Sequence, residues 1–455
     1  MKKRIPLLIL ALVCLGIVLC VVGFHHAPTK TGESTPESAV QEKAEPTVIL
    51  VEESFRGTAE ELPSIYREAF RTSAPEIRFQ TIPAEESQRE IFNTKMRIEI
   101  MAGGGPDAYL LSCGDCQKNR SEMLFASPES AMRSRLFYPL DDFIAEAEHF
   151  NPEQLNEKIL ALGQTDEGQM LLPLTYTYPV AWVKKSELKK VDSLTWEDIV
   201  SGKSKSLKWS VDRASDYPIG FSFLFPELAD WERDNLLITR EELAKRIEEK
   251  NTLQPLRFDE SLNGSAGYAL LNYWMFLNNR QKNLAYLPLC NEDETITAAV
   301  TLYAAINANA SPEKAKTAFS LFDFMLSDEL VSGEGFYVRT VDTPREEGIK
   351  VYVGQTFYSS LYASPISEQI YSFVSGISVK DRDGFLEGSF KEKPKGSMEA
   401  IREFRDRIGH VRFYSSVDAA LNKMILDAYL YEETENAEEL ADRTYDTLLM
   451  ILAES

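Results

Sequence analysis

Positive charge is scarce in this sequence. Its 455 residues include 49 lysines and arginines against 71 aspartates and glutamates, which gives a formal net charge of −22. Nucleic acids and anionic lipid surfaces attract proteins through clustered basic residues, so a chain this acidic is expected to bind no nucleic acid. Hydrophobic residues make up 44% and charged residues 26%, an ordinary globular composition that excludes a collagen-like or wholly disordered chain. The length predicts two or three domains.

Histidine is also rare, with four residues in the whole chain. The zinc-protease signature His-Glu-x-x-His is absent, and Asn263–Gly267 (NGSAG) has the wrong spacing for a serine nucleophile elbow. Gly103–Ala108 (GGGPDA) formally fits Gly-x-Gly-x-x-Ala, but it follows a helical pattern and precedes a strand, the reverse of the dinucleotide-binding context. The adjacent Asp141 and Asp142 suit a helix N-terminus better than the separated carboxylates of a glycosidase. The sequence therefore predicts no catalytic site, no cofactor and no metal.

The cysteines number only five: Cys14, Cys20, Cys113, Cys116 and Cys290. The spacing of Cys113 and Cys116 suits a local disulfide, half of a zinc site, a redox pair or two reduced thiols. Zinc would need a second pair, and a thioredoxin-like pair would open a helix, whereas this one directly follows a strand pattern. A disulfide between Cys113 and Cys116 is the expectation for an exported chain, because oxidising compartments favour disulfides.

The first 24 residues indicate export. Residues 2–4 (KKR) precede an uncharged run, residues 5–24, that as a helix with ~1.5 Å rise per residue would cover ~30 Å, about the thickness of a bilayer core. Basic residues before such a run keep the N-terminus in the cytoplasm and send the rest outside. Cys14 and Cys20 follow valine and leucine, not the small residues of a lipoprotein signal. An uncleaved anchor, a divergent lipoprotein signal and a cleaved signal peptide remain open, and the chain is expected outside the cytoplasm, tethered to the outer face of the membrane.

Residues 25–47 are polar, with three prolines and no aromatic residue. Such a segment cannot bury enough apolar surface to offset the entropy of ordering it, so it is expected to be a disordered tether. A folded body is expected from Val48 onward.

Strand-like and helix-like periods alternate along this body. The expected strands and helices are Val48–Val51, Ile77–Ile82 and Ala108–Leu111 as strands, and Ala59–Ser73, Glu85–Ala102 and the segment from Ser416 onward as helices. Thr195, Thr239 and Ser311 have the spacing of helix N-caps. The alternation predicts an α/β architecture with mostly parallel sheets.

Aromatic residues gather at the ends of expected elements. Tyr176–Trp182 (YTYPVAW) places three aromatics in seven residues, and Asn272–Trp274, Tyr303 and Phe413–Tyr414 add more. Sugars have apolar C–H faces rimmed by hydroxyls, so sugar sites combine flat aromatic rings with a few fixed polar groups. Each of these rings taken alone fits a hydrophobic core equally well.

Asn93–Ala108 (NTKMRIEIMAGGGPDA) resembles the helix–Gly-x-Gly-Pro-Asp–strand motif of the extracellular solute-binding proteins of carbohydrate ABC importers, the maltose-binding protein group. Further stretches resemble that family in the same order: Tyr138–Asp141, Asp166–Leu174 with Val183–Lys185, Leu194–Asp198, Ala304–Asn307, Ser311–Glu329 and Glu432–Ala453. Together they cover most of Val48–Ser455.

The resemblance implies a two-lobe, type II periplasmic-binding-protein-like α/β fold. Residues 48–173 and 301–362 would form lobe one, residues 174–300 and 363–455 would form lobe two, and crossing hinge segments would join them. The family implies that a solute, here a sugar, binds in the cleft between the lobes, that the hinge closes, and that the solute passes to the permease subunits of an ABC transporter. No enzymatic step is implied.

By position, the resemblance implies nine ligand-binding residues: Glu53, Ser54, Ser112, Asp115, Tyr176, Tyr178, Trp274, Tyr303 and Tyr414. Their carboxylates and serine hydroxyls would bond sugar hydroxyls, and the aromatic rings would stack on sugar faces. Gly105, Pro106 and Asp107 would be structural, forming the turn that directs the loop after the next strand.

Two other functions remain open at this stage. A ligand-sensing ectodomain that signals to a membrane receptor would share the fold, because a fold does not fix a function. An extracellular glycosidase is the enzymatic alternative.

Overall fold

The computed structural model describes residues 45–53, 56, 59–60, 62–63, 66, 76–113, 123–151, 155–184, 193–201, 218–252, 266–270, 284–326, 338–341, 349–352, 364–365, 404–430 and 436–454. Contacts divide the chain into Met1–Glu45 and a body, Pro46–Ser455, that contains all the described helices and strands. The apolar N-terminal run lies outside the described residues. Among the helices that are described, none combines the length and the apolar character needed to cross a membrane.

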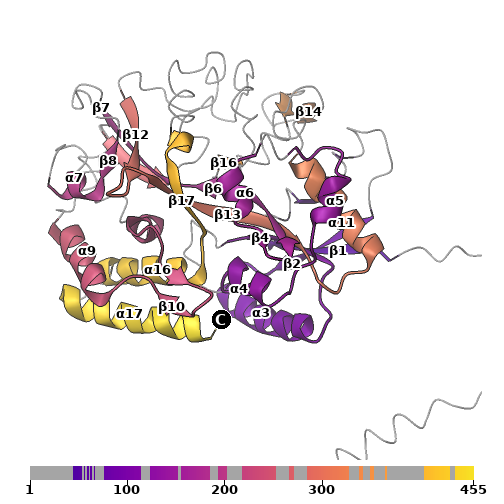
Figure 1. The fold of residues 1–455 in the computed structure, drawn as a ribbon, viewed down its shortest axis with the longest axis horizontal. Coiled ribbons are helices and arrows are strands. Elements are labelled where there is room, and N and C mark those ends of the chain that lie inside the picture. The colour runs from indigo at the N-terminus through magenta and orange to yellow at the C-terminus, as the bar shows by residue number, and fades with distance from the viewer. Residues whose placement is uncertain are drawn as a thin grey trace, which may run out of the picture. The chain divides into compact units, whose positions relative to one another are not determined.

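A seven-stranded sheet forms the larger part of the body (Figure 1). Its strands, in spatial order, are β16 (Ser364–Pro365), β6 (Leu171–Thr177), β13 (Ile296–Ile306), β3 (Ala108–Ser112), β1 (Thr47–Glu52) and β2 (Ile77–Ile82), and β17 (Ile408–Phe413) also pairs with β13. β1 has parallel neighbours in β2 and β3, and β17 runs parallel to β13. All eleven residues of β13 are buried, as expected for a strand covered on both faces.

A four-stranded sheet forms the second part. Its order is β11 (Ala266–Leu270), β7 (Pro179–Lys184), β12 (Leu284–Cys290) and β8 (Leu194–Thr195). β7 is antiparallel to both β11 and β12, and only β12 and β8 are parallel. Three short pairs complete the described strands: β4 (Gln164–Thr165) with β5 (Gly168–Gln169), β9 (Ala229–Asp230) with β10 (Asn235–Leu236), and β14 (Val338–Val341) with β15 (Ile349–Tyr352).

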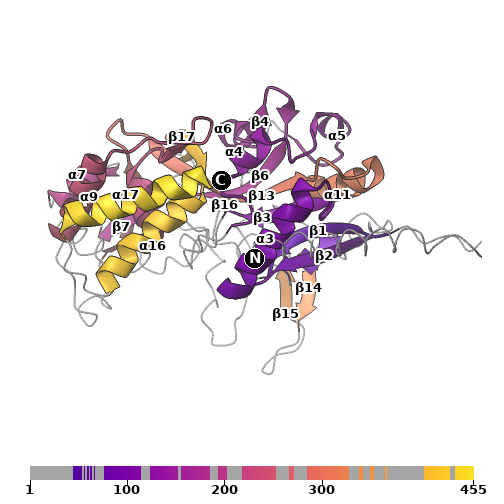
Figure 2. The ribbon, with the colours of Figure 1, turned by 90° about the horizontal axis from the view of Figure 1, so that it is seen from below.

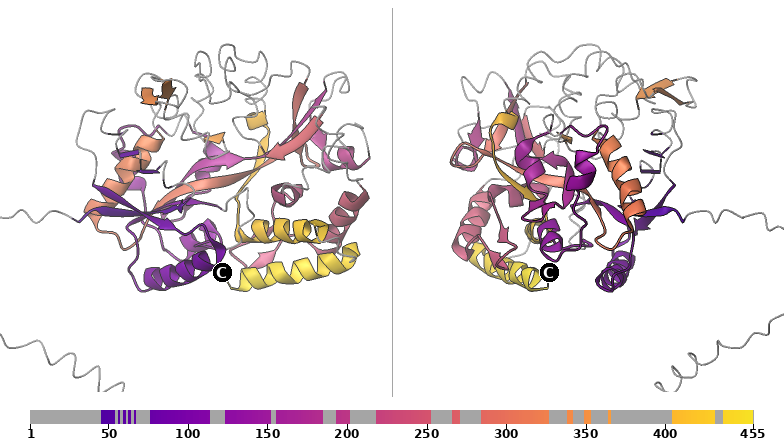
Figure 3. Two further views of the ribbon diagram at one scale, coloured as in Figure 1. Left: turned by 180° about the vertical axis from the view of Figure 1, so that it is seen from behind. Right: turned by 45° about the vertical axis from the view of Figure 1, so that its right-hand side comes forward.

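The expectation of mostly parallel sheets is wrong, because both sheets are mixed. β13 lies between β3 and β6 and is antiparallel to both. The chain enters β13 from β12, a strand of the four-stranded sheet. β13 therefore starts next to that sheet and runs opposite to β3 and β6, as the long crossing strand in Figure 3 shows. The direction of one long crossing strand therefore changes the sheet type.

Helices cover both sheets. They are α3 (Glu86–Met101), α4 (Pro128–Arg133), α5 (Asp141–Ala145), α6 (Glu157–Ala161), α7 (Trp196–Val200), the 3₁₀ helix η3 (Pro218–Leu224), α9 (Arg240–Thr252), α11 (Pro312–Met325), α16 (Ser416–Leu430) and α17 (Ala437–Ala453). The expected N-caps are confirmed: Ser311 caps α11, Thr195 forms a reciprocal capping box at α7, and the Thr239 hydroxyl accepts the Glu242 N–H at α9. α3 ends as predicted, followed by Gly103 with a φ of 83°.

The apolar side chains form two large clusters. The first packs around the seven-stranded sheet and includes β1, β3, β6, β13 and α11. The second joins η3, α9, α16 and α17. The helices α9, α16 and α17 lie together in Figures 1 and 2. β1 begins at Thr47, one residue before the expected start of the body.

Candidate functional site

The carboxyl ends of the parallel strands β1 and β3 lie side by side at one end of the seven-stranded sheet. In open α/β sheets, ligands bind beyond the carboxyl ends of the strands, where neighbouring strands lead the chain in different directions. Glu53 follows β1 directly, is exposed, and its carboxylate accepts the Ala84 N–H at 2.8 Å. Ser112 is the last residue of β3 and lies opposite Leu302 of β13. Two of the predicted site residues therefore lie at the carboxyl ends of neighbouring strands.

A buried ion pair fixes the carboxyl end of β1. Arg89 of α3 donates from both terminal nitrogens to the Glu52 carboxylate, at 2.6 and 2.7 Å. Its Nη1 also donates to the Pro83 carbonyl at 3.3 Å. The fork of a guanidinium matches a carboxylate in two parallel bonds, so the pair holds the last residue of β1 in one geometry.

The crossing between the two sheets lies next to these strand ends. A single residue, Tyr178, separates β6 from β7, and a short turn of residues 291–295 separates β12 from β13. Val300 of β13 pairs with Tyr176 on one side and Phe413 of β17 on the other. Three strands therefore meet at the point where the chain passes from one sheet to the other.

Four of the predicted tyrosines lie at this crossing. The rings of Tyr176 and Tyr178 stack with centroids 6.1 Å apart, and the Tyr414 N–H donates to the Val300 carbonyl at 3.1 Å. Tyr176, Tyr178 and Tyr414 have no exposed surface and Tyr303 has 3%. Burial raises the pKa of Tyr303, so its hydroxyl stays protonated at ordinary pH. In this conformation the four rings are packed within the protein.

The remaining predicted site residues are not placed. Ser54, Asp115 and Trp274 lie outside the described residues, as does Cys116. Cys113 is buried directly after β3, and its disulfide with Cys116 stays a prediction.

A network of buried polar side chains adjoins Tyr414. The Asn422 amide donates to the Tyr414 hydroxyl and to the Ser222 hydroxyl, both at 3.1 Å, and its oxygen accepts the Ser222 N–H at 2.9 Å. Arg412 donates to Asp418, which is fully buried, and to the Ser222 carbonyl. The network ties η3, the end of β17 and the start of α16 together.

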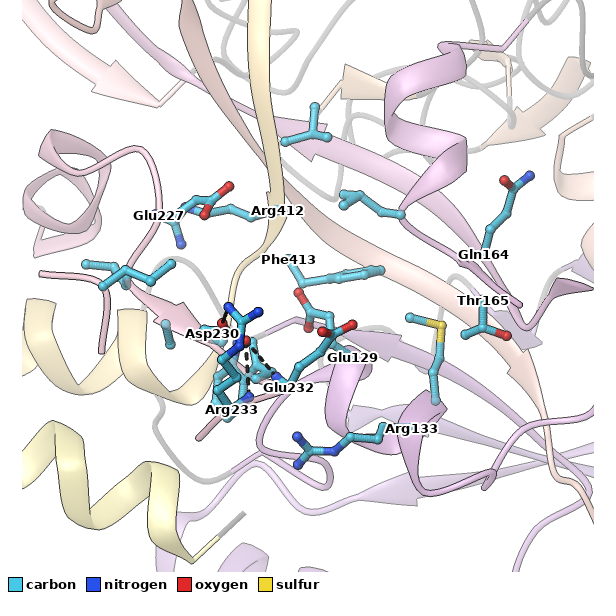
Figure 4. Close-up of a pocket in the computed structure, with 18 of the residues that line it drawn as sticks. Glu129, Arg133, Gln164, Thr165, Glu227, Asp230, Glu232, Arg233, Arg412 and Phe413 are labelled. Carbon is cyan, nitrogen blue, oxygen red and sulfur yellow. Dashed lines mark hydrogen bonds and ion pairs between the residues drawn. The ribbon is translucent and has the colours of Figure 1, made fainter. Parts of the chain in front are cut away.

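A large cavity of about 1020 Å³ lies beside this network (Figure 4). Its walls are α4, the β4–β5 hairpin, the segment 227–237, and the end of β17 with the first turn of α16. Half of the lining residues are charged, and several are paired: Arg133 with Asp234 at 3.2 Å, and Arg233 with Asp230 at 3.0 Å. None of the nine predicted residues lines this cavity.

Glu129 is the cavity residue with the most unusual environment. Its carboxylate accepts the Ser127 hydroxyl at 2.7 Å. Burial, and more weakly the nearby Asp418, raise the pKa of Glu129 to about 7. Figure 4 shows Glu129 close to Phe413.

A smaller cavity of about 410 Å³ lies between α7, η3, α9 and the end of β12. Cys290 lines it, and burial raises the pKa of that thiol, which makes it a poor nucleophile. His410 lies 3.3 Å from Asp293 at its edge. Within the described part of the chain, no group of three or more histidine, cysteine, aspartate or glutamate side chains is arranged to hold a metal ion.

No known family model matches the sequence, and no curated protein matches it. Solved structures do resemble the fold. The sugar-binding protein MalE from Xanthomonas citri gives a TM-score of 0.56 at 10% identity, covering 90% of this chain and 98% of that one. An extracellular solute-binding protein of family 1 from Alicyclobacillus acidocaldarius gives 0.54 at 12% identity, and UgpB from Mycobacterium tuberculosis, in complex with glycerophosphocholine, gives 0.53 at 12%; each comparison covers 90% of this chain and 99% of the other.

These similarities extend over almost the whole body. The chain has the α/β fold of the two-lobe, type II periplasmic solute-binding proteins, as the sequence motifs predicted. The similar structures are binding proteins and not enzymes.

Proposed function

We propose that this protein is an extracytoplasmic solute-binding protein that captures a sugar between two lobes and delivers it to the permease of an ABC transporter. The observation that carries the proposal is the fold itself, shared with solute-binding proteins over 90% of the chain. The crossing strands support it, because a sheet-to-sheet crossing gives two lobes a common hinge.

The lobes are those expected from the sequence, residues 48–173 with 301–362 and residues 174–300 with 363–455. The boundary between residues 173 and 174 falls inside β6, and the boundary between residues 300 and 301 falls inside β13. Because β6 and β13 are each joined by a short link to a strand of the other sheet, β7 or β12, these two strands and their links would be the hinge.

The solute site would lie at the carboxyl ends of β1 and β3. Glu53 is exposed there and can accept bonds from hydroxyls, and Ser54, Ser112 and Asp115 belong to the same strand ends or the loops after them. The four buried tyrosines would form the floor of the cleft beside the hinge, and Trp274 would supply a stacking face. Sugar recognition needs this combination of hydroxyl acceptors and aromatic surface.

Charge favours a neutral solute. Among the similar structures, MalE is a sugar-binding protein and MalE3 of T. maritima is bound to maltose, whereas UgpB holds glycerophosphocholine. A chain with a net charge of −22 repels anionic solutes at long range, so we favour a neutral carbohydrate over a negatively charged solute.

A thermal-shift panel tests the proposal. It would contain mono- and oligosaccharides, with amino acids, polyamines and glycerophosphodiesters as comparison classes. A true ligand at a hundredfold excess over its dissociation constant stabilises the folded state by about 2.7 kcal/mol. A rise in melting temperature with an amino acid or a phosphodiester, and with no sugar, would overturn the sugar assignment.

Export and tethering are part of the same proposal. Residues 1–24 would send the body across the membrane and hold it at the outer face, through a retained anchor or through a lipid on Cys20. Mass spectrometry of the N-terminus of the protein extracted from membranes would distinguish these forms, and a body found in the cytoplasm would contradict both.

A further inference from the structure

Two side chains connect the carboxyl ends of the neighbouring parallel strands β1 and β2. The strands pair in register up to their last residues. Beyond them, the Glu53 carboxylate on the β1 side accepts the Ala84 N–H on the β2 side at 2.8 Å. Arg89 of α3, which is buried, reaches both strand ends, because it bonds Glu52 through both terminal nitrogens and the Pro83 carbonyl through Nη1. One guanidinium therefore holds the residue before Glu53 and the residue before Ala84.

The direction of the Glu53 carboxylate depends on these contacts. A side chain is aimed by its own backbone and by the hydrogen bonds that it makes, and here both are tied to Arg89. The planar fork of a guanidinium holds a carboxylate through two parallel bonds in one geometry, which a flexible ammonium does not reproduce. Glu53 is exposed, and a carboxylate has about four acceptor positions, so Glu53 can accept a solute hydroxyl while it keeps the Ala84 bond.

The start of α3, directly after this turn, lies at the border between the proposed lobes. Glu86, the first residue of α3, has its carboxylate 3.8 Å from the ammonium of Lys423 on α16. In the proposed division, α3 belongs to lobe one and α16 to lobe two. A solute bound between the lobes at these strand ends would therefore lie beside Glu53, on the side where lobe two approaches.

We propose that Arg89 is a positioning residue of the solute site: it holds the end of β1 and the turn after β2 at the spacing that aims the Glu53 carboxylate at a sugar hydroxyl. Arg89 is buried and acts through Glu53, without contact to the solute. This role rests on the proposed function, because it concerns the same site.

Hydrogen exchange of the Ala84 amide in the ligand-free protein, followed by NMR, tests the geometry. Glu53→Ala removes the acceptor of this amide and should speed its exchange by about tenfold or more. Arg89→Lys keeps the positive charge but loses the fork, so it should speed the same exchange by a similar factor. Lys95→Met removes an exposed cation of the same helix and should leave the exchange of Ala84 unchanged.

Two results of the exchange experiment would overturn the proposal. One is an Ala84 amide that Glu53→Ala exposes and Arg89→Lys does not. The other is an Arg89→Lys protein whose amides in β1 and β2 exchange faster by the same factor as Ala84, because the substitution would then loosen the sheet in general. If Arg89→Lys does not fold, Glu52→Gln weakens the same bonds and takes its place with the same expected results.

A double-mutant cycle of sugar affinity tests the role in binding. Maltose is the first probe, and the panel carbohydrate with the largest thermal shift replaces it if maltose does not bind. Glu53→Ala and Arg89→Lys should each weaken binding by about tenfold, since each removes or misdirects a hydrogen bond to a charged acceptor. With Glu53→Ala already present, Arg89→Lys should weaken binding by less than about twofold, because it acts through Glu53.

Equal weakening by Arg89→Lys with and without Glu53 would show a purely structural role and overturn the proposal. Binding of no carbohydrate in the panel would contradict the proposed function, whereas the exchange of the Ala84 amide would still decide whether Arg89 aims Glu53. The failure of one proposal is therefore distinguishable from the failure of the other.

Discussion

At the scale of single residues, the ion pair of Arg89 and Glu52 is a buried contact with two hydrogen bonds beside the proposed site. The side chains are 2% and 10% exposed, and both guanidinium nitrogens bond the carboxylate. We expect Arg89→Met to destabilise the protein by about 3–5 kcal/mol, because it leaves the Glu52 charge buried without a partner. Urea unfolding measures this loss.

A matched control lies on the same helix. Lys95 forms an exposed pair with Glu99 at 3.8 Å, and Lys95→Met should change stability by less than about 0.5 kcal/mol. The double variant Glu52→Gln with Arg89→Met should lose less than Arg89→Met alone, since no charge remains buried. Equal losses in the single and double variants would show that packing, and not the unpaired charge, sets the cost.

A substitution at Trp274 distinguishes a ring that stacks on the sugar from a ring that packs in the core. If its ring is a sugar platform, Trp274→Ala should weaken sugar affinity by about 2 kcal/mol and leave the unfolding midpoint of the ligand-free protein nearly unchanged. Trp196 gives the opposite case, since it is 8% exposed and its indole N–H donates to Glu249 at 2.7 Å. Trp196→Ala should cost about 3–5 kcal/mol of folding stability through the cavity it leaves. Calorimetry measures the sugar affinity of both variants, and urea unfolding measures their stability. Unchanged affinity with a lowered midpoint in Trp274→Ala would show that Trp274 is a core residue.

At the scale of elements, the β4–β5 hairpin depends on one glycine. Gly168 has a φ of 117°, and a Cβ there would lie 2.0 Å from Asp141 Oδ2, the oxygen that accepts the Gln169 N–H at 3.0 Å. We expect Gly168→Ala to destabilise the protein by about 1–3 kcal/mol, because the backbone is strained and the Asp141 contact must break. Gly104→Ala is the control, since a Cβ at Gly104 meets its nearest atom at an ordinary 3.4 Å. Thermal unfolding compares the two, and similar melting temperatures would contradict this account of the hairpin.

Local signals predicted the elements well, and strand direction poorly. β2 matches its expected bounds, and the caps at Thr195, Thr239 and Ser311 are confirmed, because capping depends on residues three positions apart. Whether a buried strand runs parallel or antiparallel depends on where the chain comes from. β13 is antiparallel to β3 and β6 for that reason, and nothing in its own residues records it.

At the scale of the whole molecule, the sequence predicted the fold through the order of its motifs, but not the cavity. The walls of the cavity come from four segments separated by up to some hundreds of residues, and no sequence pattern predicts that these segments meet. Glu129 reads as an ordinary first-turn glutamate of a short helix. Its raised pKa arises from burial of the carboxylate in the folded protein and, more weakly, from the charge of Asp418. Contacts of this kind are set by tertiary structure alone.

The division between Met1–Glu45 and the body gives a prediction for the whole chain. Residues 25–47 have the composition of a tether, and the first backbone bond of β1 is donated by Thr47 to the Glu76 carbonyl at 2.9 Å. A protein lacking residues 1–45 should therefore keep the melting temperature and urea midpoint of the full chain.

Removing residues 1–52 also deletes β1, which pairs with both β2 and β3. This strand contributes Ile49, Leu50 and Val51 to the core, and none of the three has any exposed surface. That deletion should abolish cooperative unfolding, because the sheet loses a strand between two neighbours and a buried apolar face. Circular dichroism with heating and with urea compares the three proteins; a lower midpoint after removal of residues 1–45 would show that the N-terminal segment packs on the body.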